Sequence, residues 1–188
     1  MQEPVSPVER VIARISAVED RLVTGMGYLC GVLFLLLSLY TAADVVGRRF
    51  FGIFSGVTDE IGGYALALGG SWAFAYALKA GGHVRVDILL PRLSAPVRNV
   101  LDAGAMVIMA VFAGTVSVFV WKLVASSYNV GATGNSIIQT PQWIPQALMA
   151  VGYTVLAFVA VTGFLARVLA PRLFSDQAID AAPEGHKQ

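Results

Sequence analysis

Four long runs of the sequence contain no charged residue and no histidine. They are Val23 to Ala43, Ile61 to Leu78, Ala103 to Trp121 and about Trp143 to Ala166. A helix needs roughly 20 apolar residues to cross the hydrocarbon core of a bilayer. Only 13% of the residues are charged, about half the share found in ordinary soluble domains. The sequence therefore predicts an all-α integral membrane protein with four transmembrane helices. The predicted spans are about residues 23–46, 59–79, 98–125 and 143–169.

Lysine and arginine are distributed unevenly between the two sides of these spans. Ten of them lie in the N-terminal segment, the loop between the second and third spans, and the C-terminal segment. Only Arg48, Arg49 and Lys122 lie on the other side. Because cytoplasmic loops carry the excess of basic residues, we expect an N-in/C-in protein with both termini in the cytoplasm.

Two further segments flank the predicted membrane domain, which covers residues 23–172. Residues 1–22 begin with a capping box at Ser6 to Glu9 and then place apolar residues on one helical face. This pattern predicts a cytoplasmic amphipathic helix lying in the membrane interface. The alternative is an ordinary soluble helix packed on a partner. Residues 173–188 are polar and short, and are predicted to be a flexible cytoplasmic tail.

The second span carries small residues on two parallel ridges. One ridge is Gly63, Ala67, Ser71 and Ala75, and the other is Ala65, Gly69, Ala73 and Ala77. Small residues allow close approach of helices in membranes. We therefore expect this helix at the centre of the bundle, with Gly63, Ala67, Gly69, Ser71 and Ala73 as helix-packing candidates. The ridges serve either packing within the chain or a groove for a partner.

The centres of the predicted spans contain no ionisable residues. Ionisable residues are costly within a membrane and usually mark transport pathways or proton relays. The two histidines, His83 and His186, lie outside the spans, so the pattern excludes a haem held inside the bundle by two histidines. No catalytic, cofactor-binding or metal-binding residue is predicted, and we expect no enzyme. A net charge of +1 gives no reason to expect a nucleic-acid partner.

Charged residues gather instead at the ends of the first two spans. Asp44 and Arg48 are four residues apart and are expected to pair on one helical face. Arg48 or Arg49 is within plausible reach of Glu60, at the start of the second span, and such a pair would pin the two helix ends together. Two interpretations stay open here: a docking surface for an exterior partner, or a structural pair that closes a short loop.

Three segments resemble the small membrane subunit (DctQ type) of tripartite ATP-independent periplasmic (TRAP) transporters. They are "DVVGRRFFG" with "DEIGGYAL", then "KAGGHVRVDIL", and then "NSIIQTPQWIPQALMAVGY". The resemblance extends from about Asp20 to Leu173. One departure is that Val57 and Thr58 stand where many members have a tryptophan.

The resemblance implies a small scaffold subunit of the bacterial inner membrane that pairs with a large elevator-type membrane subunit. The large subunit would bind sodium and substrate, and a periplasmic binding protein would deliver an organic acid. Membrane lipids would be further partners. Matching positions give Arg48, Glu60, His83 and Asp87 roles in architecture and subunit contacts. The alternative function is an independent dimeric proton-coupled exporter of four helices, with Asp44 as the carboxylate.

Overall fold

A computed structural model describes residues 7–52, 56–80 and 95–169. Four helices account for nearly all of these residues: α1 (Pro7–Phe51), α2 (Thr58–Lys79), α3 (Ala95–Val130) and α4 (Trp143–Leu169). Each of them is long and apolar enough to cross a membrane. The prediction of an all-α chain with four membrane-spanning helices is therefore confirmed.

The first helix, α1, joins two predicted segments without a break. Its 45 residues make a rod about 67 Å long at 1.5 Å per residue, which is about twice the thickness of the hydrocarbon core. The predicted boundary after residue 22 therefore falls inside one continuous helix. The interfacial position of the N-terminal part remains a prediction.

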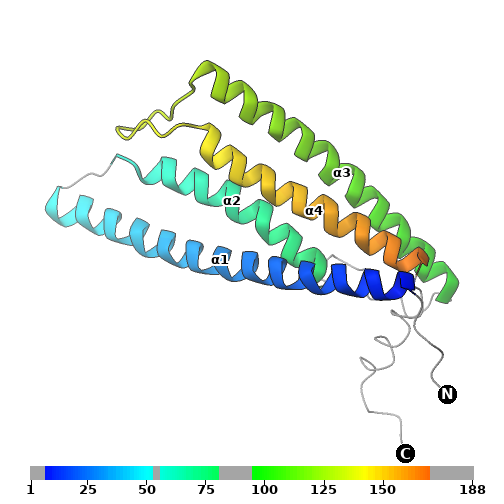
Figure 1. The fold of residues 1–188 in the computed structure, drawn as a ribbon. Coiled ribbons are helices and arrows are strands. Elements are labelled where there is room, and N and C mark those ends of the chain that lie inside the picture. The colour runs from blue at the N-terminus through cyan, green and yellow to red at the C-terminus, as the bar shows by residue number, and fades with distance from the viewer. Residues whose placement is uncertain (1–6, 53–55, 81–94, 170–188) are drawn as a thin grey trace, which may run out of the picture.

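The helices form an open fan in the order α1, α2, α4, α3 (Figure 1). α2 packs against α1 and α4, and α3 packs mainly on α4. The start of α1 and the C-terminal ends of α2 and α4 meet at one end of the fan, here called the N-terminal end (Figure 1). At the other end, the loop end, residues 131–142 connect α3 to α4. The sequence predicted α2 at the centre of the bundle, and α2 does lie between α1 and α4; α4 takes the other inner position.

Small and branched apolar residues form the core between the helices. Ala75, Ala113 and Ala160 are fully buried and pack with Leu156 and Val159. Alanine at these positions keeps the backbones close, which is how helices associate where lipid removes the hydrophobic driving force.

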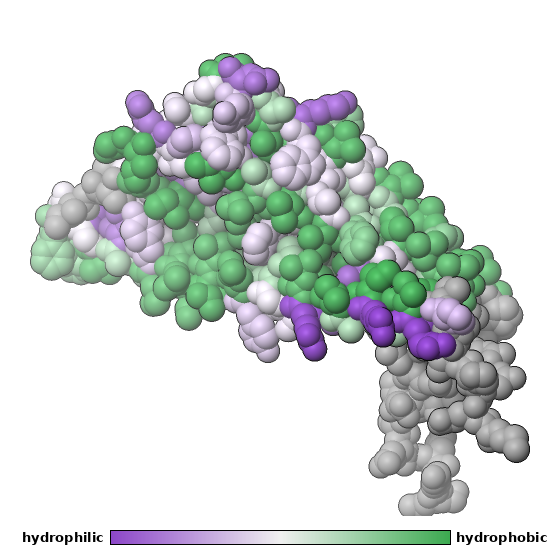
Figure 2. All heavy atoms as spheres, viewed as in Figure 1, coloured by the Kyte–Doolittle hydropathy of each residue, from purple (hydrophilic) through white to green (hydrophobic). Residues whose placement is uncertain are grey.

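The outer surface of the fan is broadly apolar. Figure 2 shows hydrophobic side chains over much of the visible face, with hydrophilic ones near its edges. Large side chains such as Leu35, Phe112 and Phe158 are more than half exposed. Exposed apolar area on this scale is unusual for a soluble monomer and suits a surface that faces lipid or another membrane protein.

Candidate functional site

Glu60, in the first turn of α2, organises the loop end of the fan. Its carboxylate accepts hydrogen bonds from the hydroxyl of Tyr64 (2.8 Å) and from the backbone N–H of Ser136 (2.9 Å). The side chains of Ser136 and Thr140 also interact with this carboxylate. Glu60, Tyr64, Gly134, Ser136 and Thr140 are called the Glu60 cluster below. The cluster ties the connection between α3 and α4 to the start of α2.

The loop closes over Glu60 because Gly134 lacks a side chain. A Cβ atom at Gly134 would overlap the Glu60 carboxylate. The loop is itself held in a hairpin-like shape, since Gly134 N–H donates to Thr140 O (2.9 Å) and Gln142 N–H donates to Ala132 O (3.0 Å). The carboxylate therefore fits against backbone that is already fixed.

The predicted pair of Asp44 and Arg48 forms near the end of α1. The guanidinium of Arg48 donates to Asp44 Oδ2 at 2.7 Å, and the Asp44 side chain is only 5% exposed. Glu60 bonds to the loop residues instead of to an arginine. Among the residues that the structure describes, the pairing of Arg48 or Arg49 with Glu60 is therefore not found. The short distance in sequence suggested an arginine as the partner of Glu60, but the loop of residues 131–142, far away in sequence, supplies the hydrogen bonds to its carboxylate.

A second polar cluster lies at the N-terminal end of the fan. The ammonium of Lys79, in the last turn of α2, donates to Glu19 Oε2 and lies equally close, 3.0 Å, to Asp20 Oδ1. It also donates to the hydroxyl and the backbone carbonyl of Ser16, at 3.1 and 3.2 Å. Thr162 of α4 donates to the other oxygen of Glu19 at 2.6 Å. Ser16, Glu19, Asp20, Lys79 and Thr162 are called the Lys79 cluster below.

The Lys79 cluster binds three helices together at one point. Glu19 is 4% exposed, and a buried carboxylate is stable only when paired and hydrogen-bonded. Sequence patterns did not single out Glu19, because it precedes the uncharged run. A signal was present: Glu19, Val23, Met26 and Cys30 follow helical spacing, and all four are buried.

The helix-packing candidates of α2 fall into two groups. Gly69 and Ser71 are buried, Ala67 is half-buried, and Gly63 and Ala73 are exposed. A Cβ atom at Gly69 would overlap the ring of Phe34, and the thiol of Cys30 contacts Gly69 O at 3.6 Å. One side of α2 therefore receives α1.

The opposite side of α2 receives α4. A Cβ atom at Gly152 would lie 2.6 Å from Ser71 Oγ and from Trp72 Cδ1. The indole N–H of Trp72 donates to Leu148 O at 2.9 Å. The two small-residue ridges thus contribute to packing within the chain, through Ser71 and Ala75 on one ridge and Ala65 and Gly69 on the other.

His83 and Asp87 lie outside the described residues, so their predicted contacts stay predictions. In the part of the chain that the structure describes, no three histidine, cysteine, aspartate or glutamate side chains gather as a metal site would require. The described charged groups are instead engaged in the clusters above, placed near the ends of the helices, or exposed along the N-terminal part of α1.

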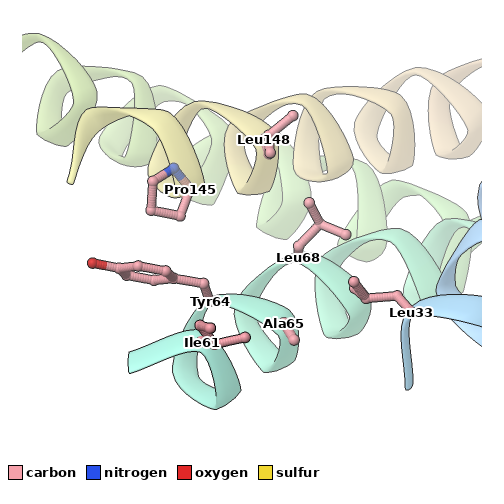
Figure 3. A pocket seen from close by; sticks show the side chains of 7 residues that line it. All are labelled: Leu33, Ile61, Tyr64, Ala65, Leu68, Pro145 and Leu148. Atoms are coloured by element: carbon pink, nitrogen blue, oxygen red, sulfur yellow. The ribbon is translucent and has the colours of Figure 1, made fainter. Parts of the chain in front are cut away.

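An apolar groove runs between α1, α2 and α4 near the loop end (Figure 3). Its volume is about 180 Å³. It is lined by Leu33, Ile61, Tyr64, Ala65, Leu68, Pro145 and Leu148. Tyr64 is its one residue with a polar side-chain group, and that hydroxyl is engaged by Glu60. Such a lining supplies no group for proton transfer or ion binding.

A comparison with known protein families identifies the family to which this chain belongs. The model of the DctQ component of tripartite ATP-independent periplasmic transporters matches residues 37–170, well over half of the chain. The chain belongs to the DctQ family. The predicted family membership is therefore confirmed. No curated protein and no solved structure matches the chain.

Because DctQ proteins are components of transporters, the two polar clusters described above belong to a transporter component. The match includes Asp44, Arg48 and the whole Glu60 cluster, whereas Glu19 precedes it. The chain is the small membrane subunit of a TRAP transporter, and its four helices indicate a multi-pass protein of the inner membrane.

Proposed function

We propose that this DctQ protein is the fixed scaffold subunit of a TRAP transporter for sodium-coupled, binding-protein-dependent uptake of an organic acid. It would pair with a large elevator-type membrane subunit, which would bind sodium and substrate. The observation that carries the proposal is the DctQ match over residues 37–170. We assign this chain no catalytic step, cofactor or metal ion.

The geometry of the fan supports a scaffold role. An elevator needs a stationary element that resists being pulled along with the moving one. α1, α2 and α4 are tied at the N-terminal end by the Lys79 cluster, and α2, α3 and α4 are tied at the loop end by the Glu60 cluster. α2 and α4 are thus joined at both ends, which favours their motion as one body over sliding past each other.

The open shape supports a partner in the membrane. A fan in which α3 packs mainly on α4 leaves long helical faces uncovered within the chain. Leu36 of α1 and Val111 of α3 are 59% and 64% exposed. We propose that part of this surface meets the large subunit and the rest meets lipid. We further propose that both termini are cytoplasmic, so that the loop end would face the periplasmic binding protein.

Reconstitution tests the proposed division of labour. Liposomes with a sodium gradient receive the chain alone, the chain with a large hydrophobic membrane protein that copurifies with it, or both with the matching binding protein. We expect uptake of labelled organic acid only in the complete system. Uptake by the chain alone would overturn the scaffold role.

Copurification tests the proposed subunit contacts. Affinity-tagged chain is isolated from native membranes, and the partners are identified by mass spectrometry. We expect His83→Ala and Asp87→Ala to reduce recovery of the large subunit, with Lys122→Gln as the control at an exposed cation. Normal recovery with lost sodium coupling would contradict an architectural role for these two residues.

A further inference from the structure

Three arginines of α1 share one side of the helix. Arg10, Arg14 and Arg21 are all exposed. Each residue advances about 100° around an α-helix, so these three lie within about 40° of one another. The ion pairs among described residues join Arg48 to Asp44 and Lys79 to Glu19 and Asp20, and include none of the three. They form a row of cations that face outward, here called the arginine row.

An apolar stripe lies directly beside the arginine row. Its exposed fractions are 56% at Val11, 37% at Ile15, 68% at Val18 and 51% at Leu22. By the same rotation per residue, the stripe is centred about 90° from the row. It continues along the same side of α1 into Leu29 and Leu36, in the part of the helix long and apolar enough to span the membrane. The stripe is therefore continuous with a surface suited to lipid.

The remaining side of this segment is fixed to the fan. Glu19 and Val23 are buried, and Lys79 holds both Glu19 and Asp20 at 3.0 Å. This contact prevents α1 from rotating about its axis. It also holds both acidic side chains described on this segment at Lys79 and so away from the arginine row, and the single ammonium balances one of their two negative charges. Figure 2 shows hydrophilic side chains in a line along the N-terminal half of α1, beside hydrophobic surface.

We propose that the arginine row binds phosphate groups of anionic phospholipids while the apolar stripe lies among their acyl chains. Guanidinium groups suit phosphate because they donate two parallel hydrogen bonds to it. A basic helical face beside an apolar one binds at the boundary between headgroups and acyl chains, and anionic lipids strengthen that binding. The Lys79 cluster holds both faces at the right rotation. The inference is independent of the transport function proposed above.

Native mass spectrometry of the full chain tests this lipid preference. Purified protein in an uncharged detergent is mixed with equal amounts of phosphatidylglycerol and phosphatidylcholine, and the ratio of the two bound lipids is measured. We expect a preference of tenfold or more for phosphatidylglycerol. Arg10→Gln, Arg14→Gln and Arg21→Gln together should bring the ratio close to one, since each basic group near an anionic surface contributes roughly fivefold.

Matched variants separate the arginine row from general charge effects. Arg49→Gln with Lys122→Gln removes two cations elsewhere and should leave the preference intact. Arg10→Lys, Arg14→Lys and Arg21→Lys together should keep most of it, which also controls for folding. Excess inorganic phosphate should not displace phosphatidylglycerol, because the stripe holds the acyl chains.

Three outcomes would overturn the proposal. One is an equal lipid ratio in the wild type, which would point instead to an acidic protein segment as the partner of the row. Another is the same loss in the Arg49/Lys122 control. The third is displacement by inorganic phosphate, which would make the row a site for the free anion.

Discussion

Single residues close the two ends of the fan. At the loop end, the Glu60 carboxylate accepts hydrogen bonds from Tyr64 and from the backbone of Ser136. At the N-terminal end, Glu19 is paired with Lys79 and hydrogen-bonded by Thr162. Each carboxylate reaches across more than 55 positions in sequence. These contacts link helices, so their loss should weaken the fan rather than remove a chemical step.

Gly134→Ala tests the fit of the loop over Glu60. The added Cβ atom would overlap the carboxylate, so the loop must shift and lose its bond to Glu60. We expect a loss of about 1–3 kcal/mol in the free energy of unfolding, the usual cost of overpacking. Thermal unfolding of the purified chain in detergent measures it. Gly104→Ala is the matched control, because nothing lies within 4 Å of that position; equal melting temperatures for both variants would contradict the close fit.

Lys79→Met tests the Lys79 cluster. It leaves the Glu19 carboxylate, only 6% exposed in its side chain, without its cation. Breaking a buried pair in this way costs about 3 kcal/mol, which should lower the melting temperature clearly. Adding Glu19→Gln should restore part of the loss, since no buried charge is then left unpaired; Asp20, the other partner of Lys79, is exposed to solvent. Lys122→Met is the control, because Lys122 is exposed and stands over the ring of Phe119 at 5.3 Å. A double variant less stable than Lys79→Met alone would argue against the pairing.

At the scale of the helix, α2 is built to be approached from two sides. Gly69 of α2 packs against the ring of Phe34 in α1. On the other side, Ser71 and Trp72 of α2 pack against Gly152 in α4. The third interface, between α3 and α4, adds a hydrogen bond between the hydroxyls of Ser117 and Thr154 (2.8 Å) and one from the indole N–H of Trp121 to Thr154 Oγ1 (3.1 Å). Close backbones and a few polar contacts hold helices together in lipid.

Gly152→Ala tests the interface between α2 and α4. The new Cβ atom would lie 2.6 Å from both Ser71 and Trp72, so the helices must separate. We expect destabilisation of about 1–3 kcal/mol, seen as a lower melting temperature in detergent. Gly114→Ala, in α3 with nothing within 4 Å, should be neutral or slightly stabilising because alanine favours helix. A neutral Gly152→Ala variant would mean that α2 and α4 are not in close contact.

At the scale of the whole molecule, the helices form a row rather than a closed bundle. α1 and α3 are the outer members, and α2 and α4 lie between them (Figure 1). The row exposes much more apolar surface than a closed bundle of the same helices would. This shape suits a subunit whose surface is completed by lipid and by a second membrane protein.

Pairs of introduced cysteines test the order of the helices. All pairs are made in a Cys30→Ala background. Gly27→Cys with Tyr76→Cys should be linked by a short bismaleimide across α1 and α2, and Met106→Cys with Gly163→Cys should be linked across α3 and α4. In both pairs the two positions lie against each other in the structure. The control pair Leu36→Cys with Val111→Cys joins the outer helices and should stay unlinked within one chain. Peptide mass spectrometry of the monomer band identifies the products. Efficient linkage of the control pair would overturn the row.

The sequence by itself determined the helices and the family. Lipid offers no hydrogen bonds to the backbone, so an uncharged run of about 20 residues has to be helical, and α4 covers the predicted residues 143–169. The pairing of Asp44 with Arg48 was also predictable, since four residues make one turn of a helix. The motifs from "DVVGRRFFG" onward were sufficient to identify the family.

Tertiary structure alone decided which helices are neighbours and which charges are buried. Helical periodicity gives the faces of a helix but not the helix that each face meets. The order α1, α2, α4, α3, the burial of Glu19 and the capture of Glu60 by the distant loop therefore lay outside the sequence pattern. All three depend on contacts between side chains and backbone far apart in the chain, and such contacts are fixed only when the helices pack.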